Sequence, residues 1–364
     1  MERRIDGAAS TQPLLHGVPA EMVVWTTRGD GIDHVRSRTV LTPRPAAGQI
    51  LVRVSAVSLN YRDLLVITGQ PGWAPTEDVV PTSDAVGEVV AVGPAVTRFR
   101  LGDRVLGAFL PKWRSGPLTA DTSTSPIGGP TNRGMLAQYV VFDQEEAVRA
   151  PATLPDAQAA ALPVAGVTAW HAVMHRCRVR SGDSVLIHGT GSVALLALQL
   201  VTALGATAIV TSSSAEKLAA AQTLGAEHVI DRRTTPDIAD AVLELTAGIG
   251  VDHAIETVGG SNLNTSLRAT RIGGTIAFIG LIAGLTADIN TYEFVTKNIS
   301  LQGIETGSVA MLEELVQFVD DRRITPTIDR IIPATEAVRG LHELQAGHTF
   351  GKVVLTLQHT AAPS

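Results

Sequence analysis

Hydrophobic and polar residues follow two different patterns along this 364-residue chain, and the pattern changes near residue 155. Before that point, short runs rich in β-branched residues alternate with Gly and Pro, which is typical of strands in an antiparallel sheet. We expect strands over residues 22–26, 50–58, 87–92, 104–109 and 136–142. This pattern predicts a mostly β domain over residues 21–150, preceded by a flexible tail of residues 1–20.

After the change, buried strands alternate with helical patterns, which is typical of βαβ units. The expected strands are residues 184–188, 207–211, 226–230, 251–256, 274–279 and 301–304, and the helices between them include 192–204, 215–224 and 238–245. Six strands joined in this way suit a doubly wound parallel sheet. We therefore expect an α/β domain over residues 151–307.

The end of the chain, residues 308–364, does not continue this repeat. We expect a helix over 310–320, a strand near 329–332, a second helix over 335–345 and a closing strand over 352–357. These elements are expected to return to the first domain. Residues 111–133, rich in Ser, Thr, Pro and Gly, predict a long surface lobe, and loops of that length are usually functional or mobile.

Composition and charge narrow the class of protein. Hydrophobic residues make up 45% and charged residues 18%, with 34 Gly, which excludes disorder for most of the chain and favours an α/β enzyme. A net charge of −6 provides no broad positive field, so nucleic acid and anionic membranes are not expected partners. The single cysteine, Cys177, excludes an internal disulfide. Without a secretory pattern or an apolar run of ~18 residues, a cytoplasmic protein is expected.

A glycine-rich turn follows the first strand of the α/β domain. It reads Gly189, Thr190, Gly191, Ser192, Val193 and Ala194, and it leads directly into a helix. This context fits a dinucleotide fingerprint, in which glycines permit a tight turn and close approach of a pyrophosphate to the helix N-terminus. We also expect contacts from the segments after the fourth and fifth strands, because ligands bind beyond the carboxyl ends of parallel strands. Those residues are Val258, Gly280, Leu281 and Ile282.

The end of the second strand indicates which cofactor is bound. An NAD-preferring site needs a carboxylate there for the ribose 2′-hydroxyl, but residues 211–214 are Thr, Ser, Ser and Ser. Ser212 and Ser213 can donate to a 2′-phosphate, and Lys217 and Arg232 can supply positive charge. The pattern favours NADPH over NADH. The alternative is that Lys217 and Arg232 are ordinary solvated surface charges.

Several ordered motifs, taken together, resemble the medium-chain dehydrogenase/reductase superfamily, in its zinc-independent quinone oxidoreductase branch. The motifs are residues 59–63 (LNYRD), 87–89 (GEV), 102–105 (GDRV), 162–169 (LPVAGVTA) and 189–191 (GTG). The resemblance covers nearly the whole chain, from residue 23 to 357. It implies a GroES-like catalytic domain made of both chain ends, a Rossmann domain between them, an active site where the two meet, and a homodimer.

The resemblance also indicates whether the chain binds zinc. Zinc-dependent relatives have a cysteine in the segment that is Leu59–Asp63 here and a four-cysteine lobe where this chain has residues 111–133, and neither is present. His171 and His175 have helical i, i+4 spacing near Cys177, but no Glu follows His171, so an ordinary helix face is expected there. We expect no zinc. Lys352 is expected at the cofactor on the resemblance alone.

Without a Lewis acid, the acceptor must take up hydride readily, as quinones and enones do. The resemblance implies that Asn60 and Thr168 lie near the nicotinamide, and Tyr61 is the nearest hydroxyl that could donate to a substrate oxygen. The alternative for Tyr61 is a packed aromatic beside the cofactor. The expected walls of a small-molecule pocket are Trp73, Trp113, Met135 and Trp170, each of which is also a possible core residue.

Two other functions remain open from the sequence. One is an enoyl-thioester reductase or another biosynthetic tailoring enzyme, with a long substrate admitted by the lobe at residues 111–133. Related enoyl reductases often have a tyrosine eleven residues after the asparagine, and this chain has Pro71 there. The other is an NADPH-binding protein with no redox turnover, because fold alone does not fix function.

Overall fold

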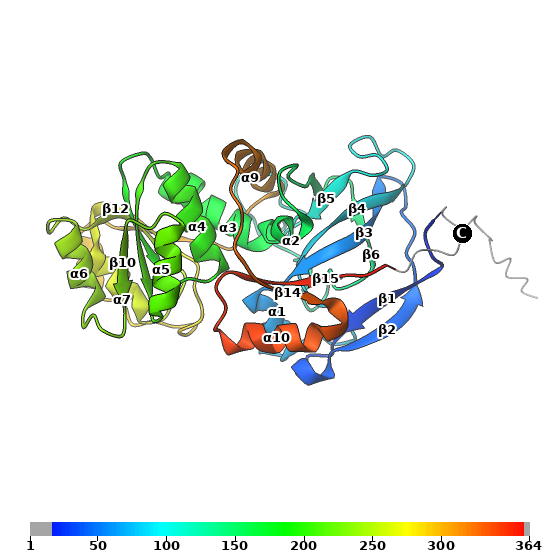
Figure 1. Ribbon diagram of the computed structural model, residues 1–364, viewed down its shortest axis with the longest axis horizontal. Coiled ribbons are helices and arrows are strands. Elements are labelled where there is room, and N and C mark those ends of the chain that lie inside the picture. The colour runs from blue at the N-terminus through cyan, green and yellow to red at the C-terminus, as the bar shows by residue number, and fades with distance from the viewer. Residues whose placement is uncertain (1–16, 360–364) are drawn as a thin grey trace, which may run out of the picture.

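The computed structural model describes residues 17–359, so most of the expected N-terminal tail lies outside the described residues. Figure 1 shows two domains side by side, with the two ends of the described chain in the same domain. The elements of the middle of the chain form the other domain. A single chain therefore crosses between the domains twice.

The domain formed by the chain ends is built on a seven-stranded sheet. Its order is β14-β15-β3-β4-β5-β7, with β6 pairing with β3, and all pairs except β14 with β15 are antiparallel. The strands are β3 (Gln49–Ser58), β4 (Asp84–Val92), β5 (Arg104–Gly107), β6 (Tyr139–Asp143), β7 (Ala147–Arg149), β14 (Ile328–Pro333) and β15 (Lys352–Thr356). A separate antiparallel pair, β1 (Glu21–Thr26) and β2 (Arg36–Leu41), lies at its outer end (Figure 1).

The other domain carries the predicted six-stranded parallel sheet, which is confirmed. Its order is β10-β9-β8-β11-β12-β13, the doubly wound order in which the chain reverses direction beside the first strand. The strands are β8 (Ser184–His188), β9 (Thr207–Ser212), β10 (His228–Asp231), β11 (Val251–Glu256), β12 (Thr270–Phe278) and β13 (Ser300–Gly303). The carboxyl ends of β8, β9, β11 and β12 consequently meet at one edge.

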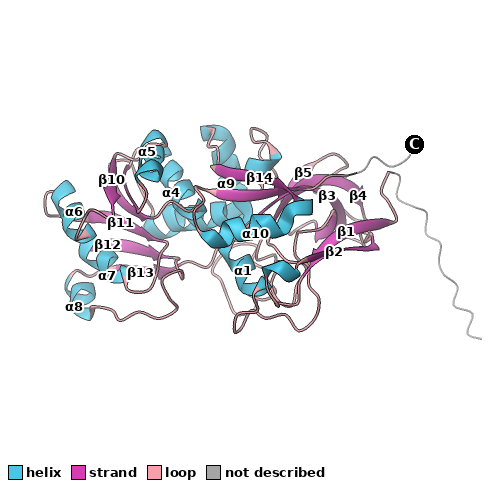
Figure 2. Ribbon diagram, turned by 60° about the horizontal axis from the view of Figure 1, so that its bottom comes forward, coloured by secondary structure: helices cyan, strands magenta, loops and turns pink. Residues whose placement is uncertain are grey.

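Helices cover both faces of this sheet, as Figure 2 shows. They are α4 (Ser192–Ala203), α5 (Ala215–Thr223), α6 (Ile238–Leu245), α7 (Asn262–Ala269) and α8 (Thr291–Thr296). Alternate side chains of β8 enter different cores: Val185 and Ile187 pack in the core that contains α4, and Leu186 packs in the core that contains α6 and α7. A strand buried on both faces explains the unbroken apolar run of β8.

The junction between the domains is helical. An irregular helical stretch comprises η2 (Leu162–Gly166), α3 (Val167–Trp170) and η3 (His171–Cys177), and α9 (Val309–Arg322) packs against it. The other helices of the first domain are η1 (Ile32–His34), α1 (Tyr61–Ile67), α2 (Asp156–Ala159), η4 (Ala334–Glu336) and α10 (Ala337–Ala346). One core cluster runs through this junction and joins residues of both domains, including Leu106 and Val185.

The elements β2, α1, α7 and α8 were not predicted, nor were the short elements η1, β7 and α2. Five of the six residues of β2 are exposed, so this strand has no apolar alternation. The helix α7 is polar along its sequence (NLNTSLRA), and α1 and α8 are too short to show a helical period. Residues 111–133 contain no helix or strand, as predicted for a surface lobe. Across residues 17–359, no helix has the length and apolar character needed to cross a membrane.

Candidate functional site

The glycine-rich turn lies between β8 and α4, as the fingerprint predicts. Gly189 has a φ of +83°, a backbone conformation that side chains with a Cβ rarely adopt. Gly191 is the N-cap of α4, and no side chain caps the N–H groups of the first helical turn. Ser192 and Val193 open the helix, and Thr190 is buried in the turn. An uncapped helix N-terminus beside a glycine turn fits the pyrophosphate of a dinucleotide.

The serines and basic residues expected to select the cofactor gather at the carboxyl ends of β9 and β10. Ser212 is buried, whereas Ser213 is exposed. The backbone N–H of Arg232 donates to the Ser212 carbonyl at 2.9 Å, which holds Arg232 beside the serines with an exposed side chain. Lys217 donates from its N–H to Ser214 Oγ at 3.3 Å in the first turn of α5. These groups fit a 2′-phosphate.

Lys217 has a second contact that joins the two domains. Its Nζ donates to the Thr349 carbonyl at 2.9 Å. Nearby, Gly191 and Gly351 pair as an isolated parallel bridge between the glycine-rich turn and the segment before β15. Residues 349–351 of the catalytic domain therefore lie against the region where the cofactor phosphates would bind.

A buried polar network supports the loop after β11. Glu256 is fully buried, and its Oε1 accepts from the N–H groups of Val258 at 2.8 Å and Gly259 at 3.0 Å. Its Oε2 accepts from Ser266 Oγ at 2.6 Å and Asn262 Nδ2 at 2.7 Å. The carboxylate therefore fixes the turn that contains Val258, one of the residues expected at the cofactor.

His188 and the loop after β12 complete this side of the site. His188 Nε2 lies 3.0 Å from Ser266 Oγ, and burial lowers the pKa of His188, with Glu256 opposing, so a neutral ring is favoured. A Cβ on Gly280 would lie 2.2 Å from the Thr257 carbonyl carbon, so the two loops pack backbone to backbone. Leu281 and Ile282, which follow, are 44% and 66% exposed.

The N-terminus of α1 places Asn60 in a second buried network, next to the domain junction. Asn60 is the N-cap, and its N–H donates to Asp63 Oδ2 at 2.8 Å in a capping box. Its Nδ2 donates to Asp84 Oδ2 at 2.8 Å, and its Oδ1 accepts from Lys352 Nζ at 2.6 Å. Burial raises the pKa of Asp63 to about 6, with the Arg62 charge opposing.

Lys352 was expected to contact the cofactor, and that contact stays a prediction. Its side chain is only 2% exposed and donates to Asn60 Oδ1 and to the Leu59 carbonyl at 3.0 Å. Its Nζ also lies 3.4 Å from Asp84 Oδ2. Because β15 pairs with β3, this lysine is aimed into the sheet interior beneath α1. Its ammonium therefore contacts both Asn60 and Asp84.

The other two residues expected near the reacting atoms differ in exposure. Tyr61, the first residue of α1, is 47% exposed, and both roles considered for it beside the cofactor stay predictions. Thr168 is buried in α3, and its hydroxyl donates to the Val164 carbonyl at 2.6 Å. Tyr61 is therefore open to solvent, whereas the proton of Thr168 is already engaged.

Three of the four expected pocket residues pack in hydrophobic cores instead. Trp113 is 1% exposed and donates from Nε1 to the Gly116 carbonyl, and Met135 is fully buried. Trp170 stacks on Phe318 of α9 at 5.1 Å between ring centroids. Trp113 and Trp170 belong to the core cluster at the domain junction, and Met135 belongs to the core of the first domain. Only Trp73 is partly exposed, in the turn after α1.

The donors in this part of the molecule do not fit a divalent metal. Asn60 Oδ1 and Asp84 Oδ2 already contact the buried ammonium of Lys352, whereas Asp84 Oδ1 is buried and has no partner among residues 17–359. His171 donates from Nδ1 to the Thr306 carbonyl at 2.5 Å and accepts from Arg176 at Nε2, so neither nitrogen is free. Among residues 17–359, no group of three or more His, Cys, Asp or Glu side chains is arranged to hold a metal ion.

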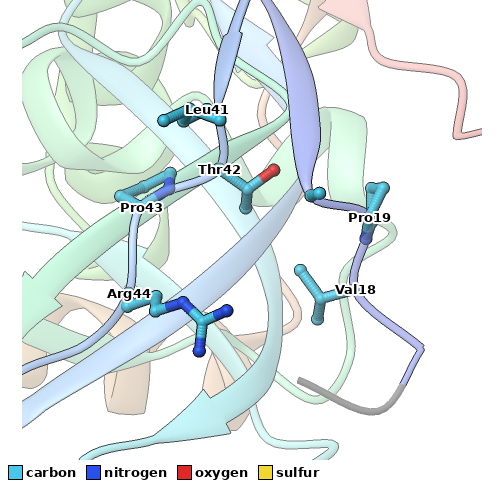
Figure 3. Close-up of a pocket in the computed structure, with 7 residues that line it drawn as sticks. Val18, Pro19, Leu41, Thr42, Pro43 and Arg44 are labelled. Carbon is cyan, nitrogen blue, oxygen red and sulfur yellow. The ribbon is translucent and has the colours of Figure 1, made fainter. Parts of the chain in front are cut away.

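A cavity of about 210 Å³ lies away from both networks (Figure 3). It is lined by Val18, Pro19, Ala20, Leu41, Thr42, Pro43 and Arg44. These residues flank β1 and β2, at the end of the molecule opposite the parallel sheet (Figure 1). The cavity contains none of the residues expected to bind a cofactor or a substrate.

Sequence reasoning missed Asp84, Glu256, Ser266 and the unusual surroundings of Arg62. An acidic residue at either end of a buried strand, such as Asp84 in β4 or Glu256 in β11, was the available signal. Buried carboxylates need partners, so each marks a polar network. The identity of those partners comes from tertiary structure.

Comparisons with known proteins agree with this arrangement. Residues 46–152 match the alcohol dehydrogenase GroES-like domain, and residues 192–321 match the zinc-binding dehydrogenase family. A zinc-type alcohol dehydrogenase-like protein from Schizosaccharomyces pombe is 34% identical over 90% of this chain and 96% of its own length. A solved candidate alcohol dehydrogenase from Sinorhizobium meliloti 1021 is 40% identical, covers 93% of this chain and 99% of its own, and has a TM-score of 0.88.

A further solved structure contains ligands. The 2-octenoyl-CoA carboxylase reductase CinF, in complex with NADP and 2-octenoyl-CoA, is 26% identical to this chain, with a TM-score of 0.82. The match covers 94% of this chain and 90% of that one. The fold of this chain is therefore shared with a reductase that binds NADP.

Proposed function

Because the chain belongs to the medium-chain dehydrogenase/reductase superfamily, a family of oxidoreductases, we propose that it is an NADPH-dependent reductase of conjugated carbonyl compounds such as quinones or enones. The nicotinamide ring supplies the hydride when the cofactor is bound. The tasks left to the protein are to bind and orient both reactants and to stabilise the negative charge that develops on the acceptor.

The preference for NADPH rests on the groups after β9. Residues 211–214 contain no carboxylate that would repel a 2′-phosphate. Ser213 and Arg232 are exposed there, and the ammonium of Lys217 is close by. Similarity to a reductase solved with NADP supports the same choice.

The observation that carries the acceptor class is the ammonium of Lys352 among the oxygens of Asn60 and Asp84. Asn60 Oδ1 and Asp84 Oδ2 contact an internal cation, which leaves Asp84 Oδ1 as the one unpartnered oxygen of this pair, too few ligands for the matched zinc family's metal chemistry. Polarisation of the acceptor then depends on hydrogen-bond donors and on the acceptor's own electrophilicity. Quinones and enones satisfy that requirement, whereas oxidation of simple alcohols does not.

A second candidate function is reduction of enoyl thioesters. It is favoured by the similarity to CinF, whose solved complex includes 2-octenoyl-CoA, and by the long lobe at residues 111–133, which could border a long substrate. Pro71, in place of the tyrosine frequent in related enoyl reductases, argues against it. The main proposal remains a quinone or enone acceptor.

The test is consumption of NADPH and of NADH, followed by absorbance, with quinones, enones, enoyl thioesters and simple ketones. Each assay is run with and without a chelator, and binding of each cofactor is measured separately by fluorescence. We expect chelator-insensitive NADPH oxidation with quinones or enones. A strong preference for enoyl thioesters would favour the second function. Tight NADPH binding without turnover on any acceptor would contradict both and indicate a non-redox role.

We also propose that the chain forms a homodimer through the outer strand of the parallel sheet. Within the described sheet β13 pairs only with β12, so its other edge is available for pairing. Large apolar side chains are exposed in the segment between β12 and β13, including Leu285 at 81%, Tyr292 at 75% and Val295 at 67%. Exposed apolar groups beside an open strand edge are typical of an interface.

A further inference from the structure

Arg62 is the second residue of α1, and its side chain is only 11% exposed. All of its hydrogen bonds come from Nη1. This nitrogen donates to Ser83 Oγ, to Asp63 Oδ1 at 3.4 Å, and to the carbonyls of Ile127 at 3.3 Å and Gly128 at 3.5 Å. One nitrogen therefore anchors the guanidinium to its own domain.

The other two nitrogens have no partner. Nε and Nη2 of Arg62 are buried, and within residues 17–359 neither forms a hydrogen bond. An arginine stays charged at any physiological pH, and leaving a buried charged donor without a hydrogen-bond partner is unfavourable. Nε and Nη2 lie along one edge of the planar group, the edge that receives oxygens in a bidentate manner. A complete anion-binding edge is thus left unused.

Aromatic rings enclose this guanidinium. Its Cζ lies 5.3 Å from the centroid of the Trp73 ring and 4.7 Å from that of the Phe109 ring. These distances fit cation–π contacts, which stabilise the charge without using its N–H groups. The low dielectric next to two rings strengthens any hydrogen bond that a charged oxygen would form with Nε and Nη2.

The position of Arg62 places this edge at the domain junction. It follows Asn60 and Tyr61, the two residues of α1 expected near the reacting atoms. Burial lowers the pKa of Arg62, and the carboxylates of Asp63, Asp84 and Glu305, which follows β13 of the other domain, oppose this shift. Among the described residues, however, the side chains of Arg62 and Glu305 form no ion pair within 4.0 Å. Charged side chains of both domains therefore lie around the guanidinium of Arg62.

We propose that the Nε and Nη2 edge of Arg62 is a subsite for a negatively charged oxygen of the acceptor. The inference rests on the proposed reduction of conjugated carbonyl compounds. When a hydride adds to the β-carbon of an enone, the carbon–carbon π pair moves and the carbonyl oxygen becomes an enolate oxygen. A proton from solvent then reaches the α-carbon and restores the carbonyl. The same edge would also receive a carboxylate already present on the substrate.

The first experiment measures binding of benzoate, a planar carboxylate, to the cofactor-free protein by calorimetry. We expect Arg62→Met to weaken binding about tenfold or more, and Arg62→Lys to weaken it about fivefold, because lysine keeps the charge but not the planar edge. The matched control is Arg322→Met, since exposed Arg322 stacks on Phe318 at 5.6 Å in α9. Far-UV and near-UV circular dichroism verify that each variant is folded.

The second experiment separates the two sources of the oxygen. The kinetics use the acceptor that the wild type reduces. If Arg62 binds the enolate oxygen formed during the reaction, Arg62→Lys should lower kcat about 100-fold with little change in KM. A substrate carboxylate predicts instead that KM rises with little change in kcat. Unchanged benzoate binding together with unchanged kcat and KM would overturn the subsite. If the wild type reduces no acceptor, the proposed function fails, and benzoate binding alone decides the role of Arg62.

Discussion

Lys352 Nζ lies 2.6 Å from Oδ1 of Asn60, although the two residues come from opposite ends of the chain. β15 brings the lysine alongside β3, and α1 begins where β3 ends. Burial lowers the pKa of Lys352, with Asp84 and Asp63 opposing. The ammonium orients the asparagine so that its Nδ2 points to Asp84. The start of α1 therefore depends on the last strand of the chain.

Replacing Lys352 with Met should destabilise the catalytic domain. The change leaves Asp84 buried without its cation, and losing one partner of a buried ion pair costs about 3–5 kcal/mol. The measurement is the free energy of unfolding in urea. Lys112→Met, at an exposed position in the lobe, is the control and should have little effect. The double change Lys352→Met with Asp84→Asn should lower the free energy of unfolding by less than the sum of the two single changes. Strict additivity of the two effects would contradict the pairing of Lys352 with Asp84.

Cofactor choice should respond to Ser213→Asp combined with Lys217→Ala. The aspartate repels a 2′-phosphate and can accept from a ribose hydroxyl, and the alanine removes a cation. Each charge-assisted contact contributes roughly 1.5 kcal/mol, so the NADPH to NADH ratio of kcat/KM should fall about 100-fold. Lys112→Ala serves as the control. If the ratio does not change, the 2′-phosphate binds elsewhere.

Much of the parallel-sheet domain was predictable because its strands are buried on both faces, α4 is a long apolar run and α6 is amphipathic. The strand and helix bounds at 184–188, 238–245 and 251–256 match the structure to the residue. By contrast, β2 has no apolar alternation and is held by pairing with β1, and α7 is polar overall, with a short apolar face that packs against α6, β11 and β12. Periodicity reports burial, so elements held by exposed pairing or polar contacts escape it.

The candidate site was predictable only where chemistry follows local sequence. The turn at Gly189 could be predicted because strand, glycine and helix are adjacent in the chain. The role of Lys352 could not, because its partners Asn60 and Asp84 are separated from it by more than 260 residues. The same limit applies to Arg62, whose ring contacts Trp73 and Phe109 come from two different loops.

The loop after β11 offers a test of indirect support for the cofactor. In Glu256→Gln, one oxygen becomes an amide nitrogen that cannot accept from Ser266 or Asn262, so the turn at Val258 should loosen. We expect NADPH binding to weaken about tenfold, with faster amide exchange at residues 258–260, because loss of one buried acceptor costs about 1–3 kcal/mol. Glu244→Gln, on the exposed face of α6, is the control. Unaltered exchange at 258–260 would show that Glu256 does not hold this turn.

The proposed dimer predicts a mass twice that of one chain in light scattering coupled to gel filtration. Leu285→Glu with Tyr292→Glu places charges in the exposed apolar region, and desolvating them would oppose association. We expect this variant to be a folded monomer. Leu41→Glu, at a residue 76% exposed beside the cavity on β2, is the control and should remain dimeric. A wild-type protein that is monomeric at micromolar concentration would exclude the dimer.

Asp63 should make stability depend on pH. Burial raises its pKa to about 6, with the Arg62 charge opposing, whereas an unfolded aspartate has a pKa near 3.8. Between these values the folded state holds a proton that the unfolded state has lost, so stability falls as pH rises from about 4 to about 6. A difference of two pKa units corresponds to about 3 kcal/mol.

Asp63→Asn removes this titration while keeping an oxygen that can accept from the Asn60 N–H. The free energy of unfolding of the variant minus that of the wild type should therefore increase as the pH rises from 4 to 6.5. Asp121→Asn, exposed in the lobe, controls for the general effect of removing an acidic group. Urea unfolding at both pH values provides the measurement. If the Asp63→Asn and wild-type curves keep a constant separation across this range, Asp63 is ionised at both pH values and Arg62 outweighs its burial.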